Sequence, residues 1–598
     1  MGEAVDGVRN EIDPIALKAK YLAERDKRLR EDGVEQYIPV SGRFAHFSAD
    51  PYAERIERAP LFDEAEVVIV GGGFGGLLTA ARLREAGVED IRIVEKGSDF
   101  GGTWYWNRYP GAACDIESYI YIPLLEEVGT MPTEKYAKAP EILAHAQAVA
   151  RKYDLYRQAL LQTEVRELRW DEAIARWIVA TDRGDRVKAR FVVLGAGFLQ
   201  QPKLPGIPGI ENFKGHAFHT SRWDYGYTGG HSKGELTGLA DKAVGIIGTG
   251  ATGVQCIPHL GAWAKQLFVF QRTPSMVGYR GNRPTDPEWV KTLTPGWQKR
   301  RMDNFNILVS GGTQDEDLVG DGWIDVFRNL PGVLVDNMPA EIAEPAQMAD
   351  YRKMEEIRAR IDSIVTDKAT AEALKPWYNQ FCKRPCFHDE YLPTFNRPNV
   401  TLVDTQGRGV ERITETGAVV DGKEYPLDCL IFATGFEVGT SYKRQTAMDI
   451  IGRGGITLTD KWRDGITTLH GMHVHGFPNA FLISATAHVG GTPNVLHIVG
   501  EITAHIAHII AETRARGAHV VEVTQDAEQA WCDTIVRMAV PAARFNEECT
   551  PSYRNNEGKM TEADLRSSFY GGGSVGYSAL LEQWRDAGTL EGLALRKG

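Results

Sequence analysis

Short runs of apolar residues, each followed at once by glycines, recur along the chain. They cover residues 66–70, 191–194, 243–247 and 429–432. A run that is apolar at almost every position is typical of a strand buried on both faces of a parallel sheet, whereas a strand with one solvated face would alternate. Helical sequence and a further apolar run follow the first and the third of these strands. The pattern therefore predicts two β-α-β units, one early in the chain and one in its middle.

The first glycine cluster, Gly71-Gly72-Gly73-Phe74-Gly75-Gly76, fits the pattern G-x-G-x-x-G between a strand and a helix. In such a motif the first glycine makes a tight turn, the second lets a pyrophosphate approach the helix N-terminus, and the third lets helix and strand pack. Glu95 stands nineteen residues after the last glycine, where a carboxylate accepts hydrogen bonds from a ribose. This site is predicted to bind FAD or NAD. The predicted contacts are Gly71, Gly73, Phe74, Gly76 and Glu95.

The second cluster, Gly248-Thr249-Gly250-Ala251-Thr252-Gly253, fits the same pattern, but Arg272 stands nineteen residues after it. A guanidinium at this place pairs with the 2′-phosphate of NADP, and Thr273 adds a hydroxyl donor. A chain that binds NADP(H) at one site and FAD at the other passes electrons from NADPH to the flavin. The predicted contacts of the second site are Thr249, Gly250, Thr252, Gly253, Gln255, Arg272 and Thr273.

These two units predict an α/β fold with two Rossmann-like doubly wound nucleotide-binding domains, of which the FAD domain is discontinuous. Residues 1–59 are expected to form an N-terminal helical extension, and residues 60–205 the first part of the FAD domain. The NADP domain is expected at residues 206–394, with a helical insert at about 285–380. Residues 395–598 are expected to complete the FAD domain and to form the C-terminal region.

The composition narrows the class of protein. Of the 598 residues, 43% are hydrophobic and 25% are charged, as in an ordinary folded chain. A net charge of −12 disfavours nucleic-acid binding, because such binders neutralise phosphates with Lys and Arg. The first residues lack the pattern of a signal peptide, and no stretch of about 20 mainly apolar residues occurs. We therefore expect a cytoplasmic protein that does not cross a membrane.

Seven cysteines, an odd number spread over the whole chain, predict no disulfide framework. Cys382 and Cys386 are expected to be packed thiols. Cys114 has no second cysteine a few residues away, so a reduced flavin in this chain is expected to react with O2 and not with a disulfide. Four possible metal ligands share one helical face: His497, Glu501, His505 and His508. One helix alone seldom encloses a metal, so no metal site is expected.

A further motif links the chain to a known family. The segment 213–224 fits F-x-G-x-x-x-H-x-x-x-W-[P/D], and with it the chain resembles the type I Baeyer–Villiger monooxygenases. Residues 101–111, Lys383-Arg384 and Ala433-Thr434-Gly435 extend this resemblance. The related flavin monooxygenases that oxidise nitrogen or sulfur usually carry Tyr or Lys in place of Trp223.

The resemblance implies an NADPH- and O2-dependent oxidation of a ketone to an ester or a lactone through a C4a-peroxyflavin. The long N-terminal arm, the insert and residues 383–391 are most similar to the branch typified by cyclopentadecanone monooxygenase, which implies a bulky or large-ring ketone. Two alternatives stay open: a flavin monooxygenase acting on sulfur or nitrogen, and a non-catalytic FAD/NADP redox sensor. O2 and the ketone are the expected partners, and the oligomeric state is left open.

Several site residues of the family match positions of this chain. Arg384 resembles the active-site arginine that holds the anionic peroxide and the oxyanion, and Asp115 would pair with it. Lys383 resembles a second clamp on the 2′-phosphate. Two positions depart from the family pattern, since Ala113 replaces an Arg and Tyr553 replaces a Trp that many relatives carry. The remaining cofactor contacts are Thr103, Trp104, Tyr105, Trp106, Asp115, Tyr121, Val165, Lys383 and Arg384.

Overall fold

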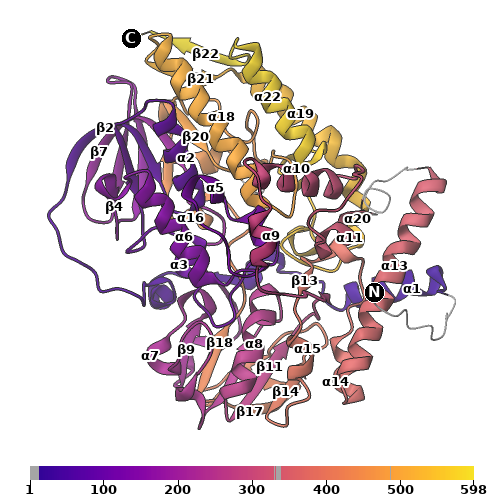
Figure 1. The fold of residues 1–598 in the computed structure, drawn as a ribbon. Helices are drawn as coiled ribbons and strands as arrows, with labels where there is room; N and C mark the ends of the chain where they lie inside the picture. Colours follow the sequence, from indigo (N-terminus) through magenta and orange to yellow (C-terminus); the bar gives the residue numbers. More distant parts are fainter. Residues whose placement is uncertain (1–11, 329, 331–338, 485–486, 598) are drawn as a thin grey trace.

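The computed structural model describes residues 12–328, 330, 339–484 and 487–597 of the chain. Two α/β units, each built on its own sheet, stand one above the other in Figure 1. The C-terminal helices cover one side of the upper unit, and the helices of the insert run down beside both units. The predicted α/β fold with two nucleotide-binding units is confirmed.

The upper sheet contains the strands that the early apolar runs predict. Within the described residues its order is β19-β5-β6-β7-β2-β3-β4, with β20 beside β7. β2 (Phe62–Val70) pairs in parallel with β3 (Ile91–Val94) and with β7 (Arg186–Leu194), and its apolar half is fully buried. Helix α2 (Phe74–Glu85) follows β2 directly. The other strands are β4 (Ala159–Leu160), β5 (Val165–Asp171), β6 (Arg176–Thr181), β19 (Asp449–Ile451) and β20 (Ala480–Leu482).

The lower sheet, as far as the structure describes it, is parallel throughout and has the order β14-β11-β10-β18-β9. Its strands are β9 (His216–His219), β10 (Ala243–Ile247), β11 (Gln266–Gln271), β14 (Val400–Asp404) and β18 (Cys429–Phe432). β14 and β18 thus belong to the NADP unit, although the division of the sequence at residue 394 placed them with the FAD domain. An apolar strand does not reveal which of two parallel sheets it joins, so that boundary was drawn too early.

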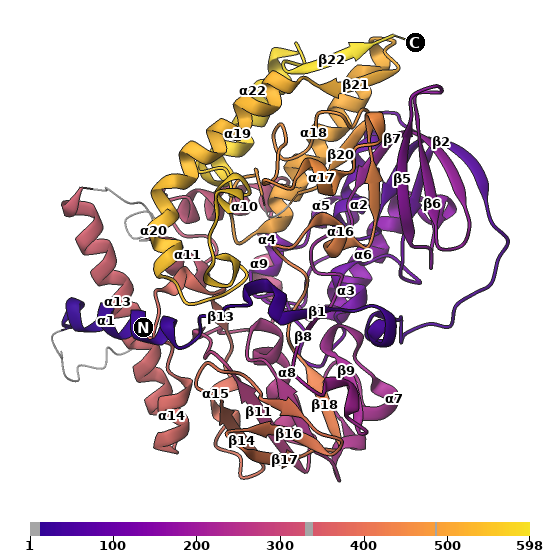
Figure 2. The ribbon, with the colours of Figure 1, turned by 180° about the vertical axis from the view of Figure 1, so that it is seen from behind.

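The described part of the N-terminal extension begins with a helix and then runs between the two units. Helix α1 (Pro14–Asp26) begins at Asp13, whose carboxylate accepts hydrogen bonds from two backbone N–H groups of the first turn. Its buried face packs on α13 (Ala340–Ile364) of the insert. β1 (Tyr37–Pro39) then pairs antiparallel with β8 (Lys203–Pro205). Figure 2 shows β1 and β8 between the two halves of the molecule.

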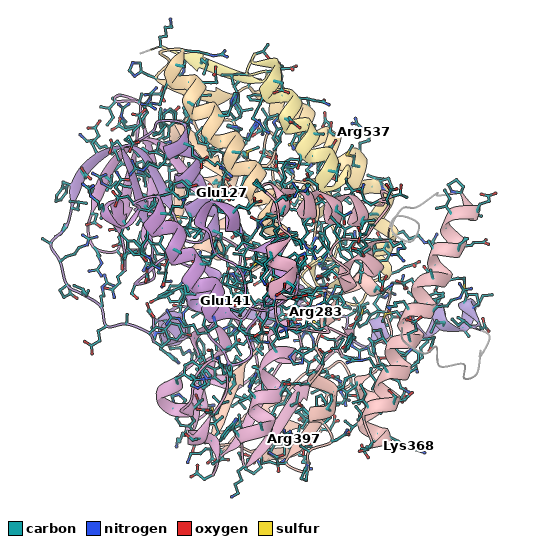
Figure 3. All side chains as sticks on the ribbon, in the orientation of Figure 1. Glu127, Glu141, Arg283, Lys368, Arg397 and Arg537 are labelled. Carbon is teal, nitrogen blue, oxygen red and sulfur yellow. A yellow bond between two sulfur atoms is a disulfide. The ribbon has the colours of Figure 1, made fainter. Side chains whose placement is uncertain are left out.

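The predicted insert is helical and lies against the junction of the units. Among its described helices are α9 (Pro287–Lys291), α10 (Trp297–Val309), α11 (Gly322–Arg328), α13 and α14 (Lys368–Leu374). An ion pair of 2.6 Å between Arg301 on α10 and the fully buried Glu117 fixes the insert to the first unit. Charged side chains such as Lys368 and Arg397 project from the surface (Figure 3).

Helix α18 (Val495–Ala515) is long and apolar enough, by length and composition, to cross a membrane. In the fold, however, Ile502, Ile506 and Ile510 are fully buried, and the helix packs against α2 and α22 (Gly573–Ala587). We therefore describe α18 as a core helix. It also carries the four possible metal ligands noted above, and no metal-binding group of His, Cys, Asp and Glu is found among the described residues.

Candidate active site

A cavity of about 1940 Å³ lies between the two units and is lined by both glycine turns. Pockets for one small ligand usually measure about 300–1,000 Å³, so this cavity has room for more than one nucleotide. It receives residues from the N-terminal extension, from both sheets, from the insert and from the C-terminal region. Of the predicted cofactor contacts, all but Gly76, Tyr105 and Gly253 line it.

The first glycine turn has the shape that a pyrophosphate site requires. Gly71 has φ +103°, which L side chains rarely adopt. A Cβ on Gly76 would lie 1.9 Å from the carbonyl oxygen of Gly71, so this glycine serves the packing of α2 on β2. Glu95 is 5% exposed and accepts 2.6 Å hydrogen bonds from the N–H groups of Gly72 and Gly97. Burial raises its pKa, and these two donors oppose that shift. These features fit FAD.

The second glycine turn repeats this arrangement in the lower unit. Gly248 has φ +111°, and a Cβ on Gly253 would lie 2.4 Å from the carbonyl oxygen of Gly248. A Cβ on Gly250 would meet nothing within 4 Å, so the backbone at the start of α8 (Ala251–Trp263) is open toward the cavity. Gln255 on α8 accepts a hydrogen bond of 2.8 Å from Tyr109 and donates one of 3.0 Å to the Ala113 carbonyl.

Cationic groups gather beside this second turn, as a 2′-phosphate needs. Arg272 and Lys383 line the cavity together with Lys203, which the sequence analysis did not identify. The hydroxyl of Thr273 is buried without a hydrogen-bond partner. Burial, and then the charge of Arg272, lower the pKa of Lys383 to about 8. An unpartnered donor among several cations is a suitable place for a phosphate group, so the residues present fit NADP(H).

Groups from distant parts of the chain surround Arg272. It donates to the side-chain oxygen of Gln36, to the Tyr37 hydroxyl at 3.4 Å and to the Glu557 carboxylate at 3.4 Å. None of these three was expected from the sequence, because no motif connects them with the glycine turn. Burial lowers the pKa of Arg272, but Tyr37 and Glu557 outweigh it and raise that pKa.

Arg384 and Asp115 face each other in the cavity wall. Their side chains form an ion pair of 2.6 Å, and they are 35% and 11% exposed, respectively. Burial lowers the pKa of Arg384, but the Asp115 carboxylate raises it by more than burial lowers it. The pKa therefore lies above its usual value, and the guanidinium keeps its charge. Trp323 of α11 donates to the backbone carbonyl of Asp115 at 3.1 Å, and its ring centroid lies 5.6 Å from the Arg384 guanidinium. No sequence motif pointed to Trp323.

The aromatic loop α3 (Thr103–Trp106) divides its side chains between the cavity and the core. Trp104 lines the cavity and donates to the Tyr121 hydroxyl at 3.2 Å. Tyr105 points away, since its hydroxyl donates to Asp50 at 2.5 Å and the side chain is 1% exposed. The predicted flavin contact of Tyr105 is therefore not supported by its position.

The signature segment 213–224 lies outside the cavity lining. Trp223 is fully buried and donates through its ring N–H to Thr228 at 3.1 Å. Its backbone N–H donates to the hydroxyl of Tyr52, which in turn donates to the carbonyl of Trp106. The segment therefore connects the lower unit with the aromatic loop.

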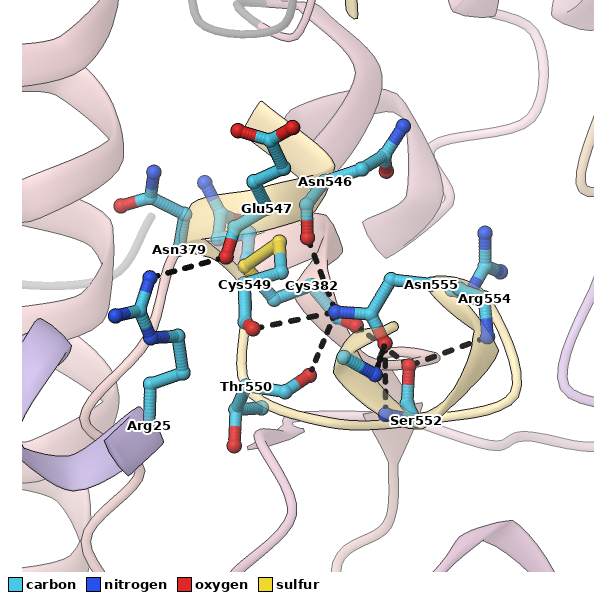
Figure 4. The surroundings of a disulfide bond; sticks show 12 residues. Arg25, Asn379, Cys382, Asn546, Glu547, Cys549, Thr550, Ser552, Arg554 and Asn555 are labelled. Atoms are coloured by element: carbon cyan, nitrogen blue, oxygen red, sulfur yellow. Dashed lines mark hydrogen bonds between the residues drawn. A yellow bond between two sulfur atoms is a disulfide. The ribbon is translucent and has the colours of Figure 1, made fainter. Parts of the chain in front are cut away.

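A disulfide joins Cys382 to Cys549, 167 residues further along the chain. The expectation that Cys382 is a packed thiol was wrong, and the separation explains why: no spacing pattern connects two cysteines so far apart. Figure 4 shows the C-terminal loop around this bond. Ser552 donates to the Cys382 carbonyl at 3.2 Å, and the Asn555 amide donates to the Cys549 carbonyl at 3.2 Å. The loop is thus fixed directly beside Lys383 and Arg384.

Comparisons with known proteins agree with this geometry. A family model described as pyridine nucleotide-disulphide oxidoreductase matches residues 68–229. The neopentalenolactone D synthase of Streptomyces avermitilis is 55% identical, with 98% of this chain and all of that protein covered. A Baeyer–Villiger monooxygenase of Streptomyces coelicolor is 49% identical, with 98% of each chain covered. The chain belongs to the Baeyer–Villiger monooxygenase family.

The fold of this Baeyer–Villiger monooxygenase matches that of a solved relative over almost the whole chain. The polycyclic ketone monooxygenase of Thermothelomyces thermophila is 41% identical and superposes with a TM-score of 0.92, covering 98% of this chain and 99% of that one. Two further solved neighbours are described as bound to NADP and to FAD with NADP. The enzyme is therefore an FAD-containing, NADPH-dependent monooxygenase, and this activity fits better than a sulfur or nitrogen oxygenase or a redox sensor.

Proposed function

We propose that this enzyme oxidises bulky or large-ring ketones to esters or lactones at the cavity wall formed by Arg384 and Asp115. The observation that carries the proposal is this ion pair, which lies in one cavity with both nucleotide turns. When bound, FAD would supply the redox chemistry, which needs electrons from NADPH and an oxygen atom from O2.

Arg384 is assigned the electrostatic role. Attack on a ketone puts negative charge on the carbonyl oxygen, and a guanidinium that cannot lose its proton stabilises that charge throughout the reaction. Asp115 orients the guanidinium before the substrate arrives, and Trp323 fixes Asp115 through its backbone carbonyl. Such preorganisation costs little reorganisation at the moment of oxygen transfer.

The cationic cluster is assigned to NADPH. Arg272 and Lys383 would hold the 2′-phosphate, and the unpartnered Thr273 hydroxyl would donate to it. The first glycine turn and Glu95 would hold FAD in the upper unit. Trp104 and Tyr121, which meet at a ring distance of 5.9 Å, would close the wall beside the flavin.

The size of the substrate is inferred from relatives. One relative is named for a polycyclic ketone, and the name of another identifies a lactone as its product. Large aromatic side chains line the cavity, among them Trp323, Phe327 and Phe381. We also propose that the chain belongs near the cyclopentadecanone monooxygenase branch. A cytoplasmic location is proposed as well: five cysteines of the described chain are buried and free, whereas the Cys382–Cys549 disulfide is the one cysteine feature of these residues that disfavours a reducing compartment.

A panel of ketones graded by size tests the proposal, with the products identified by mass spectrometry. We expect esters or lactones from macrocyclic, steroidal and other polycyclic ketones, with lower kcat/KM for small rings. Amines and sulfides of matched size serve as the comparison, and we expect them to be poorer substrates. Conversion of small cyclic ketones alone would contradict the size assignment, and preferential oxidation of amines or sulfides would contradict the ketone assignment.

A further inference from the structure

An acidic side chain stands among the cations that we assign to the 2′-phosphate. Glu557 is only 4% exposed, lines the cavity and lies 3.4 Å from the Arg272 guanidinium. Its other oxygen accepts a hydrogen bond of 3.1 Å from the Tyr37 hydroxyl. Burial lowers the pKa values of Lys203 and Lys383, and the Glu557 carboxylate opposes this shift at both lysines. One carboxylate thus acts on every cation of the cluster.

The backbone holds Glu557 in this place against its own preference. Its φ is +53°, a region that non-glycine residues rarely occupy and that persists only where the surroundings enforce it. The Glu557 N–H donates to the Ser552 carbonyl at 2.8 Å, and Ser552 in turn is bonded to Cys382. The disulfide between Cys549 and Cys382 anchors the same loop, and Cys382 directly precedes Lys383. The loop therefore presents this carboxylate to Arg272 in a fixed position.

A carboxylate in this position affects NADP and NAD differently. The 2′-phosphate of NADP carries close to two negative charges at neutral pH, so Glu557 repels it and competes with it for Arg272. The ribose of NAD has a neutral hydroxyl at the same place, and a carboxylate does not repel it. The Glu557 carboxylate therefore disfavours the binding of NADP but not the binding of NAD.

We propose that Glu557 is a specificity-determining residue that weakens the binding of the 2′-phosphate and so limits how strongly the enzyme prefers NADP over NAD. The inference rests on the assignment of the 2′-phosphate to Arg272, and it does not depend on which ketone is oxidised. A moderate affinity would let NADP⁺ leave the site after turnover.

The test is equilibrium binding by titration calorimetry on the FAD-loaded enzyme, with NADP⁺ and NAD⁺ measured separately. For Glu557→Gln we expect the Kd for NADP⁺ to fall about tenfold, which corresponds to about 1.4 kcal/mol. The Kd for NAD⁺ should stay within about twofold of the wild-type value, since a single neutral hydrogen bond changes little. Glu557→Asp keeps the charge, but its shorter side chain places the carboxylate farther from Arg272, so we expect an intermediate increase in affinity for NADP⁺. This variant serves as the test if Glu557→Gln folds poorly.

Glu411→Gln is the matched control, because Glu411 also lines the cavity but makes no contact with Arg272. It should leave both dissociation constants unchanged. Unchanged or weaker NADP⁺ binding by both Glu557 variants would overturn the proposal, as would an equal gain for NADP⁺ and NAD⁺. Arg272→Ala tests the location of the phosphate site separately from the effect of Glu557. If that variant binds NADP⁺ as well as the wild type does, the 2′-phosphate has been assigned to the wrong site.

Discussion

Arg384 is the residue on which oxygen transfer should depend most. An electrostatic stabiliser of developing negative charge contributes roughly 10²–10³ in rate, so Arg384→Ala should lose ester formation by at least about that factor. Hydride transfer from NADPH builds no oxyanion on the substrate, so the flavin should still be reduced and the oxygen should be lost as hydrogen peroxide. Arg384→Lys keeps one charge but lacks the planar fork that meets Asp115, and only partial recovery is expected.

Stopped-flow flavin reduction without oxygen, followed by ester and peroxide assays in air, separates these steps. Arg408→Ala is the control, since Arg408 lines the same cavity but pairs with the exposed Asp421. Ester formation at a near wild-type rate in Arg384→Ala would show that another group stabilises the negative charge.

Lys383 should make the binding of NADP⁺ depend on pH. Because its pKa is about 8 and a bound phosphate favours the charged amine, binding raises that pKa. The affinity should therefore be full below about pH 7 and should fall as the pH rises through about 8, by at most about tenfold per pH unit. Calorimetric titration of NADP⁺ across this range measures the effect, and Lys383→Gln should flatten the profile. A flat wild-type profile, or an unchanged one in the variant, would contradict this role.

The sequence identified the residues of this site that belong to local motifs and missed those that do not. Glu95 and Arg272 follow their glycine turns at a fixed spacing, and both line the cavity. Trp323 and Glu557 come from the insert and from the C-terminal loop, and only the tertiary fold brings them to Asp115 and Arg272. Tyr105 shows the opposite error, since a motif position faces the core.

At the scale of elements, the disulfide should hold the C-terminal loop against the cation cluster. A cross-link that closes a loop of 167 residues restricts the unfolded chain strongly, and in the chain-entropy model bonds closing more than about 100 residues contribute about 5 kcal/mol. Cys549→Ser should lower Tm by several degrees and should lower the Kd for NADP⁺, because the released loop no longer holds the Glu557 carboxylate against Arg272. Thermal unfolding and NADP⁺ titration measure the two effects.

Cys532→Ser is the matched control for this change, since Cys532 is buried and free. A reducing agent should reproduce the effect of Cys549→Ser in the wild type and should have no further effect on that variant. Equal Tm values with and without the reducing agent would show that the bond does not stabilise the protein in solution.

The elements themselves were largely predictable, but their partners were not. The run 66–70 forms the end of β2 and the run 243–247 forms the whole of β10, because a fully apolar strand has few alternatives to a buried parallel sheet. β18 was equally recognisable as a strand, yet it pairs with β10 of the lower unit. Pairing between strands depends on the path of the whole chain, and a local pattern carries no information about that path.

At the scale of the molecule, function depends on two nucleotide units closing one cavity. The N-terminal extension runs between them at β1 (Figure 2). The signature segment connects the lower unit to the aromatic loop through the hydrogen bonds of Trp223 and Tyr52. The relation to the polycyclic ketone monooxygenase extends over the whole chain, so these connections lie within the shared fold. The position of Arg384 in one cavity with both glycine turns is a property of this arrangement and of no single domain.

The most direct measurement follows the oxygen atom itself. The FAD-loaded enzyme is incubated with NADPH, a polycyclic ketone and O2 enriched in a heavy oxygen isotope, and the product is analysed by mass spectrometry. We expect an ester or lactone that has gained one labelled oxygen atom, with one NADPH consumed for each product formed. Consumption of NADPH with only hydrogen peroxide as product from every ketone tested, or an unlabelled ester, would contradict oxygen transfer from O2 at this site.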